Sequence, residues 1–380
     1  MIEKSKPYIS ACVKRRELIY DWMARESIAL VMIEDCESRR DPAVRWLSGQ
    51  PGDALLFLSV DRKSLLVPWD YNMAMLLSQA DLLIPYTEFD RKAIKAALGA
   101  ADILKTASGS RVEIPSSTPY PLFLKYVEAL SDFDVICREN GIGPEIEKKR
   151  AVKDEDEIKL YKKISTLTSE MTDLLEKYVR SGKIKTEADA ALFIETECRE
   201  CGCEGTGFEI LAAGPGRSFG IHAFPAYTAG NFGGQGLSIL DYGLKYAGYT
   251  SDVTLSFACG PLSKHQEKMI SLVEKAYQTA ISMTGPGVYA REIALAVKSF
   301  FAKAKKTMPH GLGHGIGMEA HEAPVVNTAE DNEWLLEPGM IITIEPGLYD
   351  PVHGGCRLEN DVLITETGAE VLTNSRIIRL

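Results

Sequence analysis

The chain has 380 residues and a net charge of −10, with 45% hydrophobic and 25% charged residues. This length favours two domains, and the composition is typical of a soluble globular protein with a large core. The acidic charge argues against nucleic acid and against an anionic membrane as partners, because both require a basic face. No stretch approaches the roughly 18 uncharged apolar residues of a membrane span, and the charged N-terminal segment lacks the apolar core of a signal peptide.

Eight cysteines are scattered along the chain without the spacing of a disulfide framework. In a chain of this length, such cysteines are typical of reduced thiols in a cytoplasmic protein. Three of them, Cys198, Cys201 and Cys203, lie close together at the end of a predicted helix. A zinc site requires four ligands, and no fourth cysteine or histidine is near in sequence. The cluster therefore indicates structural thiols rather than a metal site.

Residues 1–145 are predicted to form an α/β domain. Short apolar runs bounded by charged, Gly or Pro residues predict three buried strands, 28–33, 54–59 and 64–69. The Gly- and Pro-rich segment 41–53 predicts a loop between the first two. Two helices are expected after the strands, 71–79 and 89–98. This mixture of strands and helices is typical of an α/β domain.

A dense mixture of charges at 139–163 marks the expected boundary between the domains. We interpret this run of charges as a solvated face. The residues that follow carry apolar side chains at alternating spacings of four and three, which is the pattern of one buried stripe on a long helix. The members of this stripe are Leu160, Ile164, Leu167, Met171, Leu174 and Tyr178.

Residues 155–380 are predicted to form an α+β domain, with helices around a mostly antiparallel sheet. Capping-box patterns predict that helices begin near Thr186 and after Ser263. A further helix is expected over 290–305. The segments with strand character are 237–243, 249–258, 339–347 and 357–365.

Three of the six histidines lie in the sequence HGLGHGIGMEAHE, residues 310–322. A zinc-binding helix is disfavoured here, because each of four glycines costs a helix about 1 kcal/mol relative to alanine and the His-Glu-x-x-His pattern is absent. A phosphate-binding loop is also disfavoured, since no Gly-Lys-Ser/Thr follows the glycines. The segment can therefore supply only part of a metal site.

Four carboxylates interrupt the apolar segments of the C-terminal domain: Asp241, Asp252, Glu345 and Glu359. A buried carboxylate without a partner costs several kcal/mol. One such residue is best interpreted as facing solvent, whereas four of them beside a histidine-rich loop indicate a shared cation. Four carboxylates and a histidine suit two divalent ions such as Mn²⁺, Co²⁺ or Zn²⁺.

This pattern resembles the pita-bread metallopeptidases, the family of methionine aminopeptidase, aminopeptidase P, prolidase and creatinase. The resemblance rests on FEILAAGPGRSFGIHAFPA, LDYGLKYAGYTSDVTLSF, HGLGHGIGMEAHEAP, EPGMIITIEPGLY and CRLENDVLIT, and on two aspartates eleven residues apart. It covers residues 155–380 strongly and residues 1–140 more loosely, through VRWLSG. It implies a C-terminal pita-bread fold and a smaller creatinase-like α/β N-terminal domain, which is typical of the aminopeptidase P, prolidase and creatinase branch.

The resemblance also implies a metal site. The residues that match the family's metal ligands are Asp241, Asp252, His314, Glu345 and Glu359. Asp252 and Glu359 match the bridging pair, and Glu345 also matches the proton shuttle for a metal-bridging hydroxide. Mn²⁺ is the first candidate for the two divalent ions.

Other residues match supporting positions. His222 and His321 match two catalytic histidines that do not bind metal, one positioning the substrate and the other donating to the carbonyl oxygen. Arg357 matches a residue that orients a carboxylate ligand. His310 is interpreted as a loop or supporting histidine. Two histidines match no motif and are expected at the surface, His265 and His353.

The implied function is a dinuclear exopeptidase that removes the N-terminal residue from peptides with proline second. Some prolidases carry an arginine four residues after the second histidine, where it can pair with the carboxylate of a dipeptide. The residue here is Val325, which favours a Xaa-Pro aminopeptidase over the alternative, a Xaa-Pro dipeptidase (prolidase).

Two further alternatives are less favoured, because no metal ligand is missing: a metal-independent creatinase-like C–N hydrolase and a non-catalytic peptide-binding module. The expected partner is a peptide substrate. The resemblance also implies a homodimer in which the N-terminal domain bounds the partner's active site.

Overall fold

The computed structural model describes residues 6–380, with side chains described from residue 11 onward. The chain divides into two compact units, Met1–Lys149 and Arg150–Leu380. Each unit has its own helices, strands and apolar core. Within the described range, none of the helices has both the length and the apolar character needed to cross a membrane.

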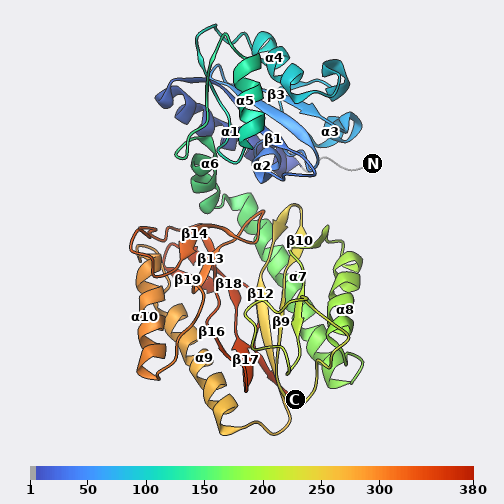
Figure 1. The fold of residues 1–380 in the computed structure, drawn as a ribbon, viewed down its shortest axis with the longest axis vertical. Coiled ribbons are helices and arrows are strands. Elements are labelled where there is room, and N and C mark those ends of the chain that lie inside the picture. The colour runs from blue at the N-terminus through green and yellow to red at the C-terminus, as the bar shows by residue number, and fades with distance from the viewer. Residues whose placement is uncertain (1–5) are drawn as a thin grey trace. The chain divides into compact units, whose positions relative to one another are not determined.

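One six-stranded sheet forms the centre of the N-terminal unit, with the order β4-β3-β2-β1-β5-β6 (Figure 1). The apolar side chains alternate between its faces, so that Leu30, Met32 and Phe57 pack against the helices α4 and α5 on one face. The helices α1 and α2 contact β1. The elements are α1 (Lys6–Glu26), β1 (Ile28–Asp35), α2 (Pro42–Ser48), β2 (Ala54–Ser59), β3 (Lys63–Pro68), α3 (Tyr71–Leu77), β4 (Leu82–Leu83), the 3₁₀ turn η1 (Tyr86–Phe89), α4 (Ala93–Ile103), β5 (Arg111–Glu113), α5 (Tyr120–Ala129), β6 (Asp134–Ile136) and α6 (Ile142–Ala151).

The three predicted strands of this unit are confirmed as β1, β2 and β3, whereas the predicted loop at 41–53 is wrong because it contains α2. The Asp41 side chain caps this helix by accepting a hydrogen bond from the Ala43 backbone. Proline follows the cap, and Gly49 ends the helix with a left-handed φ of 78°. Proline and glycine therefore mark the two ends of a short helix here.

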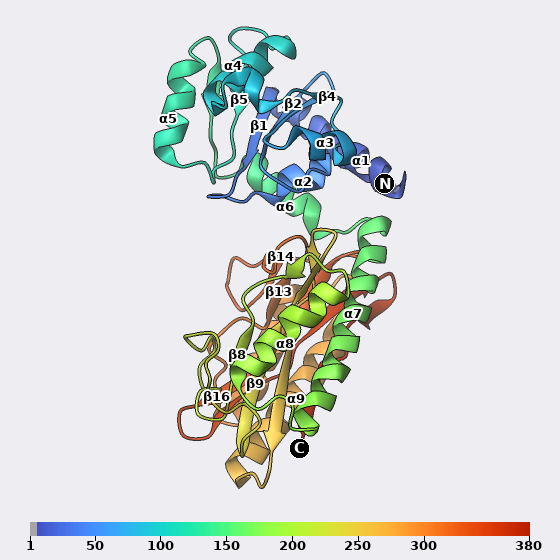
Figure 2. The same cartoon turned by 90° about the vertical axis from the view of Figure 1, so that its right-hand side faces the viewer.

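The C-terminal unit has helices on two sides of its strands, with α7 and α8 on one side and α9 and α10 on the other (Figures 1 and 2). Its sheets have the orders β11-β10-β7, β20-β12-β9-β8, β14-β13-β15-β18-β19 and β16-β17. All their pairings are antiparallel except that of β12 with β20. The predicted α+β class with a mostly antiparallel sheet is confirmed.

The elements of this unit follow one another in the order α7 (Glu155–Arg180), α8 (Glu187–Glu200), β7 (Gly205–Thr206), β8 (Leu211–Ala213), β9 (Gly236–Tyr242), β10 (Leu244–Tyr246), β11 (Tyr249–Thr250), β12 (Val253–Cys259), α9 (Lys264–Met283), α10 (Ala290–Lys303), β13 (Gly313–Gly315), β14 (Glu322–Val326), β15 (Ile341–Ile344), β16 (Gly347–Asp350), β17 (Gly354–Arg357), β18 (Asn360–Thr365), β19 (Gly368–Val371) and β20 (Ile377–Arg379). Capping boxes at Thr186 and Ser263 begin α8 and α9, which confirms both predicted helix starts.

The buried face of α7 differs from the predicted apolar stripe. Leu160, Leu167 and Leu174 are only half-buried, whereas the polar residues Tyr161 and Thr168 are fully buried. The Tyr161 hydroxyl donates to the Thr250 carbonyl at 2.8 Å, and the Thr168 hydroxyl lies 2.7 Å from that of Ser251. Hydrogen bonds to the strand ends thus allow a more polar face to pack inward than apolar periodicity predicts.

Most charged side chains of 139–163 are exposed or half-buried, as predicted, but the interpretation as a solvated run is wrong at three of them. The segment forms α6 and the start of α7, and Arg150, Lys153 and Glu157 are buried. Arg150 and Lys153 pair with the buried carboxylate of Glu322, and Glu157 accepts a hydrogen bond from the Tyr249 hydroxyl at 2.7 Å. These charges are tolerated in the interior because each has a partner distant in sequence.

Candidate metal centre and active site

Three of the four candidate carboxylates lie at breaks between strands rather than inside them. Asp252 separates β11 from β12, Glu345 follows β15, and Glu359 separates β17 from β18. The predicted continuous strands at 249–258, 339–347 and 357–365 are therefore wrong at these positions. A break lets the backbone turn a side chain away from the alternating pattern of a pleated strand and into a cavity.

Asp241 differs from the other three because it lies within β9, opposite Thr254 of β12. Thr254 also forms an isolated bridge with Glu359, and its hydroxyl donates to the Glu359 carboxylate at 2.7 Å. Because the backbones of Asp241 and Glu359 both pair with that of Thr254, these two carboxylates lie on either side of it. The remaining carboxylates are held at their backbones, because Asp252 N donates to Asp361 and Glu345 N donates to the Leu312 carbonyl.

His314 is in the short strand β13, between two glycines that pack closely against neighbouring backbone. A Cβ at Gly313 would lie 2.0 Å from the Thr343 carbonyl oxygen, and one at Gly315 would lie 2.0 Å from that of Ala323. The glycines of HGLGHGIG therefore do not serve mainly to bend a loop. They let β13 approach its neighbours closely enough to bring His314 beside the carboxylates.

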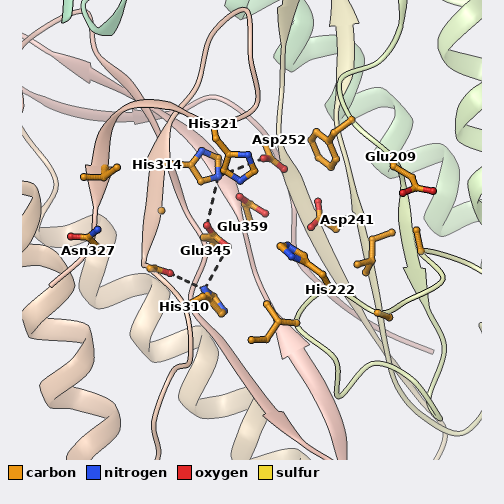
Figure 3. Close-up of a pocket in the computed structure, with 18 of the residues that line it drawn as sticks. Glu209, His222, Asp241, Asp252, His310, His314, His321, Asn327, Glu345 and Glu359 are labelled. Carbon is orange, nitrogen blue, oxygen red and sulfur yellow. Dashed lines mark hydrogen bonds and ion pairs between the residues drawn. The ribbon is translucent and has the colours of Figure 1, made fainter. Parts of the chain in front are cut away.

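These side chains converge on one cavity of about 560 Å³ (Figure 3). His314 Nε2 is 3.8 Å from Asp252 Oδ2 and 3.7 Å from Glu345 Oε1. Potential ligand atoms of Asp252, His314 and Glu359 all lie within 4.8 Å of one another. Asp241 faces the same cavity. The structure thus brings together all five residues that the sequence analysis proposed as ligands.

The cavity concentrates negative charge that the adjacent buried cation, Arg357, balances only in part. Burial, and then repulsion from neighbouring carboxylates, raises the pKa of Asp252 and Glu345 well above their ordinary values. The same causes raise the pKa of Glu359 to about 7. Asp241 Oδ1 and Asp252 Oδ1 are buried and have no hydrogen-bond partner among the described residues. Unpaired, mutually repelling oxygens of this kind are the donors that divalent cations require.

The histidine at this cluster is in the protonation state that suits a metal ligand. Burial lowers the pKa of His314 to about 4, so its ring is neutral at pH 7 and offers a lone pair. Its Nδ1 lies 3.1 Å from the Gly315 carbonyl oxygen. A hydrogen bond from Nδ1 to this carbonyl leaves Nε2, the atom that faces the carboxylates, unprotonated. The residues present therefore fit bound divalent cations.

Arg357 is the buried cation behind the carboxylates. Its guanidinium pairs with Asp241 and donates to the Thr254 hydroxyl at 2.9 Å. It also donates to the Tyr349 hydroxyl at 2.9 Å and to the Ile221 carbonyl at 3.0 Å. One side chain thus orients Asp241, supports Glu359 through Thr254, and fixes the segment that precedes His222.

The two histidines proposed to act on substrate also line the cavity. His222 lies in the segment between β8 and β9, and His321 precedes β14. The His321 ring centroid is 4.2 Å from that of His314. Burial lowers the pKa of His321. Figure 3 shows His321 beside His314 and His222 on the Asp241 side of the carboxylates.

His310 occupies a supporting position at the same cavity. Its Nε2 is 2.9 Å from the Tyr349 hydroxyl, and its Nδ1 is 3.7 Å from Glu345. His265 and His353 are outside the cavity, where their rings stack at 4.1 Å.

The cysteine cluster also lies away from the cavity. Cys198 and Cys203 belong to the apolar core between α7, α8 and the strands, while Cys201 is exposed. Among the described residues, the only cluster with the spacing of metal ligands is the one at His314.

Two buried carboxylates near the site are not predicted from the sequence. Asp361 is fully buried and accepts the Asp252 backbone hydrogen bond at 3.2 Å. Glu322 follows His321 and is held by Arg150 and Lys153. Glu322 also accepts from the Glu319 backbone at 3.0 Å, which fixes the turn that carries His321. The only feature of the sequence that points to them is their position: Glu322 directly follows His321, and Asp361 lies two residues after Glu359.

Comparison with known proteins agrees with this geometry. The model of metallopeptidase family M24 matches residues 159–366. A Xaa-Pro dipeptidase of Pyrococcus horikoshii is 28% identical over 363 residues, covering 94% of this chain and 96% of that protein. The crystal structure of a prolidase from the same organism superposes with a TM-score of 0.81 at 26% identity, covering 96% of this chain and 99% of the other.

An X-Pro aminopeptidase structure from Thermotoga maritima has the same TM-score of 0.81 at 23% identity, with 96% and 99% of the two chains covered, and supports the fold alone. The predicted pita-bread fold with a smaller N-terminal domain is confirmed by these structures. The family also implies bound divalent metal ions. Because the family model spans more than half of the sequence, the chain belongs to metallopeptidase family M24 and is a peptide-bond hydrolase.

Proposed function

We propose that this protein is a Xaa-Pro aminopeptidase that uses two divalent ions, Mn²⁺ first among them, to remove the N-terminal residue from peptides. One observation carries the aminopeptidase assignment. Among the described residues, the catalytic cavity is lined by five carboxylates and by no lysine or arginine. A dipeptide would place its own carboxylate in this cavity without a cationic partner, whereas a longer peptide carries that charge elsewhere.

The charge of the cavity also supports the proposed binding of two divalent ions. Asp241, Asp252, Glu345 and Glu359 carry four negative charges when ionised, and two divalent ions supply four positive ones. When bound, such ions lower the pKa of a water molecule and polarise the scissile carbonyl. The fifth lining carboxylate, Glu209, belongs to a different part of the wall, before β8. Glu209 is proposed to attract the N-terminal ammonium of the substrate.

The side chains of this chain have separate tasks in the proposed reaction. Glu345 receives a proton from the attacking water and passes it to the leaving amine. His321 donates a hydrogen bond to the carbonyl oxygen as charge develops there, and His222 positions the residue on the other side of the scissile bond. Arg357 keeps Asp241 oriented. Apolar residues such as Leu211 and Ile221 form part of the wall of the cavity and limit the access of water there.

A second candidate function is a Xaa-Pro dipeptidase. The names of the relatives from Pyrococcus horikoshii favour it, because they are a Xaa-Pro dipeptidase and a prolidase. Val325 lines the cavity at the position where some prolidases carry arginine, and it offers no charge for a dipeptide carboxylate. Because Val325 lacks the charge of this arginine, we favour the aminopeptidase over the dipeptidase.

A cleavage panel with added Mn²⁺ separates the two functions. The substrates are Met-Ala, Ala-Pro and Ala-Pro-Gly, and released residues are resolved by chromatography. We expect cleavage of Ala-Pro-Gly at a kcat/KM at least about tenfold above that of Ala-Pro, and little cleavage of Met-Ala. Preference for Ala-Pro would establish the dipeptidase, and preference for Met-Ala would refute the requirement for proline. Light scattering in the same buffer tests the proposed homodimer.

A further inference from the structure

We propose that a second cavity beside the catalytic one binds the carboxylate at the far end of a peptide substrate, through Lys298 and Lys306. This inference rests on the proposed function and specifies its substrates, namely peptides long enough to place an anionic group in that cavity. The anionic group is either the C-terminal carboxylate or an acidic side chain.

The second cavity shares part of its wall with the catalytic cavity. It has a volume of about 540 Å³ and lies between α10 and the segment that leads into β13. His310, Gly311 and Asn327 line both cavities. In the proposed binding mode, a peptide that extends from the catalytic cavity past these shared residues reaches the second cavity.

The charge of the second cavity is opposite to that of the first. Lys298 and Lys306 line it, and no Asp or Glu does so among the described residues. Neither lysine has a carboxylate partner in the part of the chain that the structure describes, although Lys306 Nζ lies 3.2 Å from His265 Nε2. Lys153 and Lys162, by contrast, each pair with a glutamate. Two ammonium groups at one cavity of an acidic protein attract an anion.

Asn327 lies at the junction of the two cavities and is held in one orientation. Its Oδ1 accepts hydrogen bonds from Ala329 N at 3.1 Å and from Asn332 Nδ2 at 3.2 Å. These bonds leave the Nδ2 group of Asn327 to donate to a peptide carbonyl. Thr307 and Thr328 add hydroxyl groups beyond it. The junction thus offers hydrogen bonds to a peptide backbone without depending on its side chains.

A peptide fits this arrangement because its two ends have opposite charges. The N-terminal ammonium meets the carboxylate-rich cavity, and the other end extends by about 3.4 Å for each residue. Only a chain of sufficient length can place its carboxylate near the lysines. The inference therefore predicts that the benefit of a free carboxylate begins at a defined peptide length and weakens at high salt.

The test compares pairs of peptides that differ only at the C-terminus. Ala-Pro-(Gly)n with n from 1 to 4 is prepared as the free acid and as the amide, together with amidated Ala-Pro-Gly-Glu and Ala-Pro-Gly-Gln. For the Mn²⁺-loaded protein, we expect the acid-to-amide ratio of kcat/KM to reach roughly threefold to tenfold at one length, mainly through KM. If a Glu side chain can replace the C-terminal carboxylate, the Glu peptide exceeds the Gln peptide by a similar factor.

Each of the variants Lys298→Gln and Lys306→Gln should bring the acid-to-amide ratio of kcat/KM closer to one. The double variant should show no difference between acid and amide. Lys303→Gln is the matched control, because Lys303 is an exposed lysine of α10 that does not line the cavity. Thermal melting checks that each variant is folded. A ratio near one at every length in the unmodified protein, or an unchanged ratio in the folded double variant, would overturn the inference.

A failure of the proposed function gives a different result. If the Mn²⁺-loaded protein cleaves none of the peptides, the aminopeptidase assignment fails. Titration calorimetry with the same acid and amide pairs then still measures binding without catalysis. Tighter binding of the acid, lost in the double variant, supports the second cavity, and equal binding of acid and amide refutes it.

Discussion

The two neighbouring cavities of the C-terminal unit differ in both charge and construction. The catalytic cavity takes three carboxylates from breaks between strands and a fourth, Asp241, from within β9, and hydrogen bonds with the surrounding segments hold them in place. The second cavity presents two lysines, one from α10 and one from the segment after it. The first is built to hold cations in a defined geometry, whereas the second can attract an anion without precise placement. In this proposal, the first cavity carries out catalysis and the second selects substrates by their length.

Removing a carboxylate from the catalytic cavity should have the largest effect. Asp252→Asn deletes a proposed bridging ligand, so we expect kcat/KM to fall by more than the roughly 10- to 100-fold typical of residues that only support ligands. It also relieves repulsion among buried carboxylates. The metal-free variant should therefore melt at a higher temperature than the metal-free unmodified protein.

Elemental analysis and thermal melting with and without Mn²⁺ measure these effects. The unmodified protein should gain melting temperature with Mn²⁺, and Asp252→Asn should lose most of that gain. Asp173→Asn is the control, because Asp173 is an exposed partner of Arg376. An active Asp252→Asn protein with full metal content would refute the role of Asp252.

The second largest effect is expected from breaking the ion pairs of Glu322, which fix the turn before β14. Burial raises the pKa of Glu322, but the charges of Arg150 and Lys153 outweigh it and hold this pKa below its ordinary value. Glu322→Gln removes the buried carboxylate that both cations share and leaves Arg150 with only Glu319 as its ion-pair partner among the described residues, so we expect a loss of about 3 kcal/mol in the free energy of unfolding at pH 7.

The pH dependence of this loss follows from the direction of the shift. A carboxyl whose pKa is lower in the folded state stabilises the protein above its unfolded pKa of about 4.3 and loses this contribution as the pH falls through the folded pKa. Urea unfolding at several pH values should show the difference between the two proteins shrinking below about pH 4. The control is Glu319→Gln, at a half-exposed partner of Arg150. A constant difference at all pH values would contradict the ionised pairing.

Placing a cation in the catalytic cavity should produce a smaller effect on substrate choice. Val325→Arg adds a guanidinium where some prolidases carry one, so the ratio of Ala-Pro to Ala-Pro-Gly cleavage should rise by about tenfold. Val325→Gln is a polar but uncharged control and should change the ratio much less. The same ratio in both variants would show that charge at this position does not distinguish a dipeptide from a longer peptide.

The sequence predicts the chemistry of the site more accurately than the local structure around it. Residue types single out Asp241, Asp252, Glu345 and Glu359, the family resemblance adds His314, and the structure gathers all five around one cavity. The same sequence predicts continuous strands through three of these positions. Apolar patterning cannot reveal such breaks, because they depend on hydrogen bonds from distant segments, such as Glu359 N to the Thr254 carbonyl.

Buried polar residues account for two further errors, both near α7. Apolar periodicity places Leu160 and Leu167 on the inner face of α7, but Tyr161 and Thr168 lie there because strand-end groups accept or share their hydrogen bonds. Two cations of the charged segment before α7, Arg150 and Lys153, are buried because they pair with Glu322, about 170 residues away in sequence. In the N-terminal unit, where the core is apolar, the three predicted strands are confirmed. Apolar patterning therefore predicts strands whose burial is apolar, and it fails where burial depends on polar partners.

The most direct test of the central claim is removal and restoration of metal. The protein is treated with a chelator, freed of it, and assayed on Ala-Pro-Gly before and after addition of Mn²⁺ or Co²⁺, with bound metal measured in each sample. We expect cleavage to disappear with the metal and to return as about two ions bind per chain. Cleavage that continues at the same rate in verified metal-free protein would contradict the account.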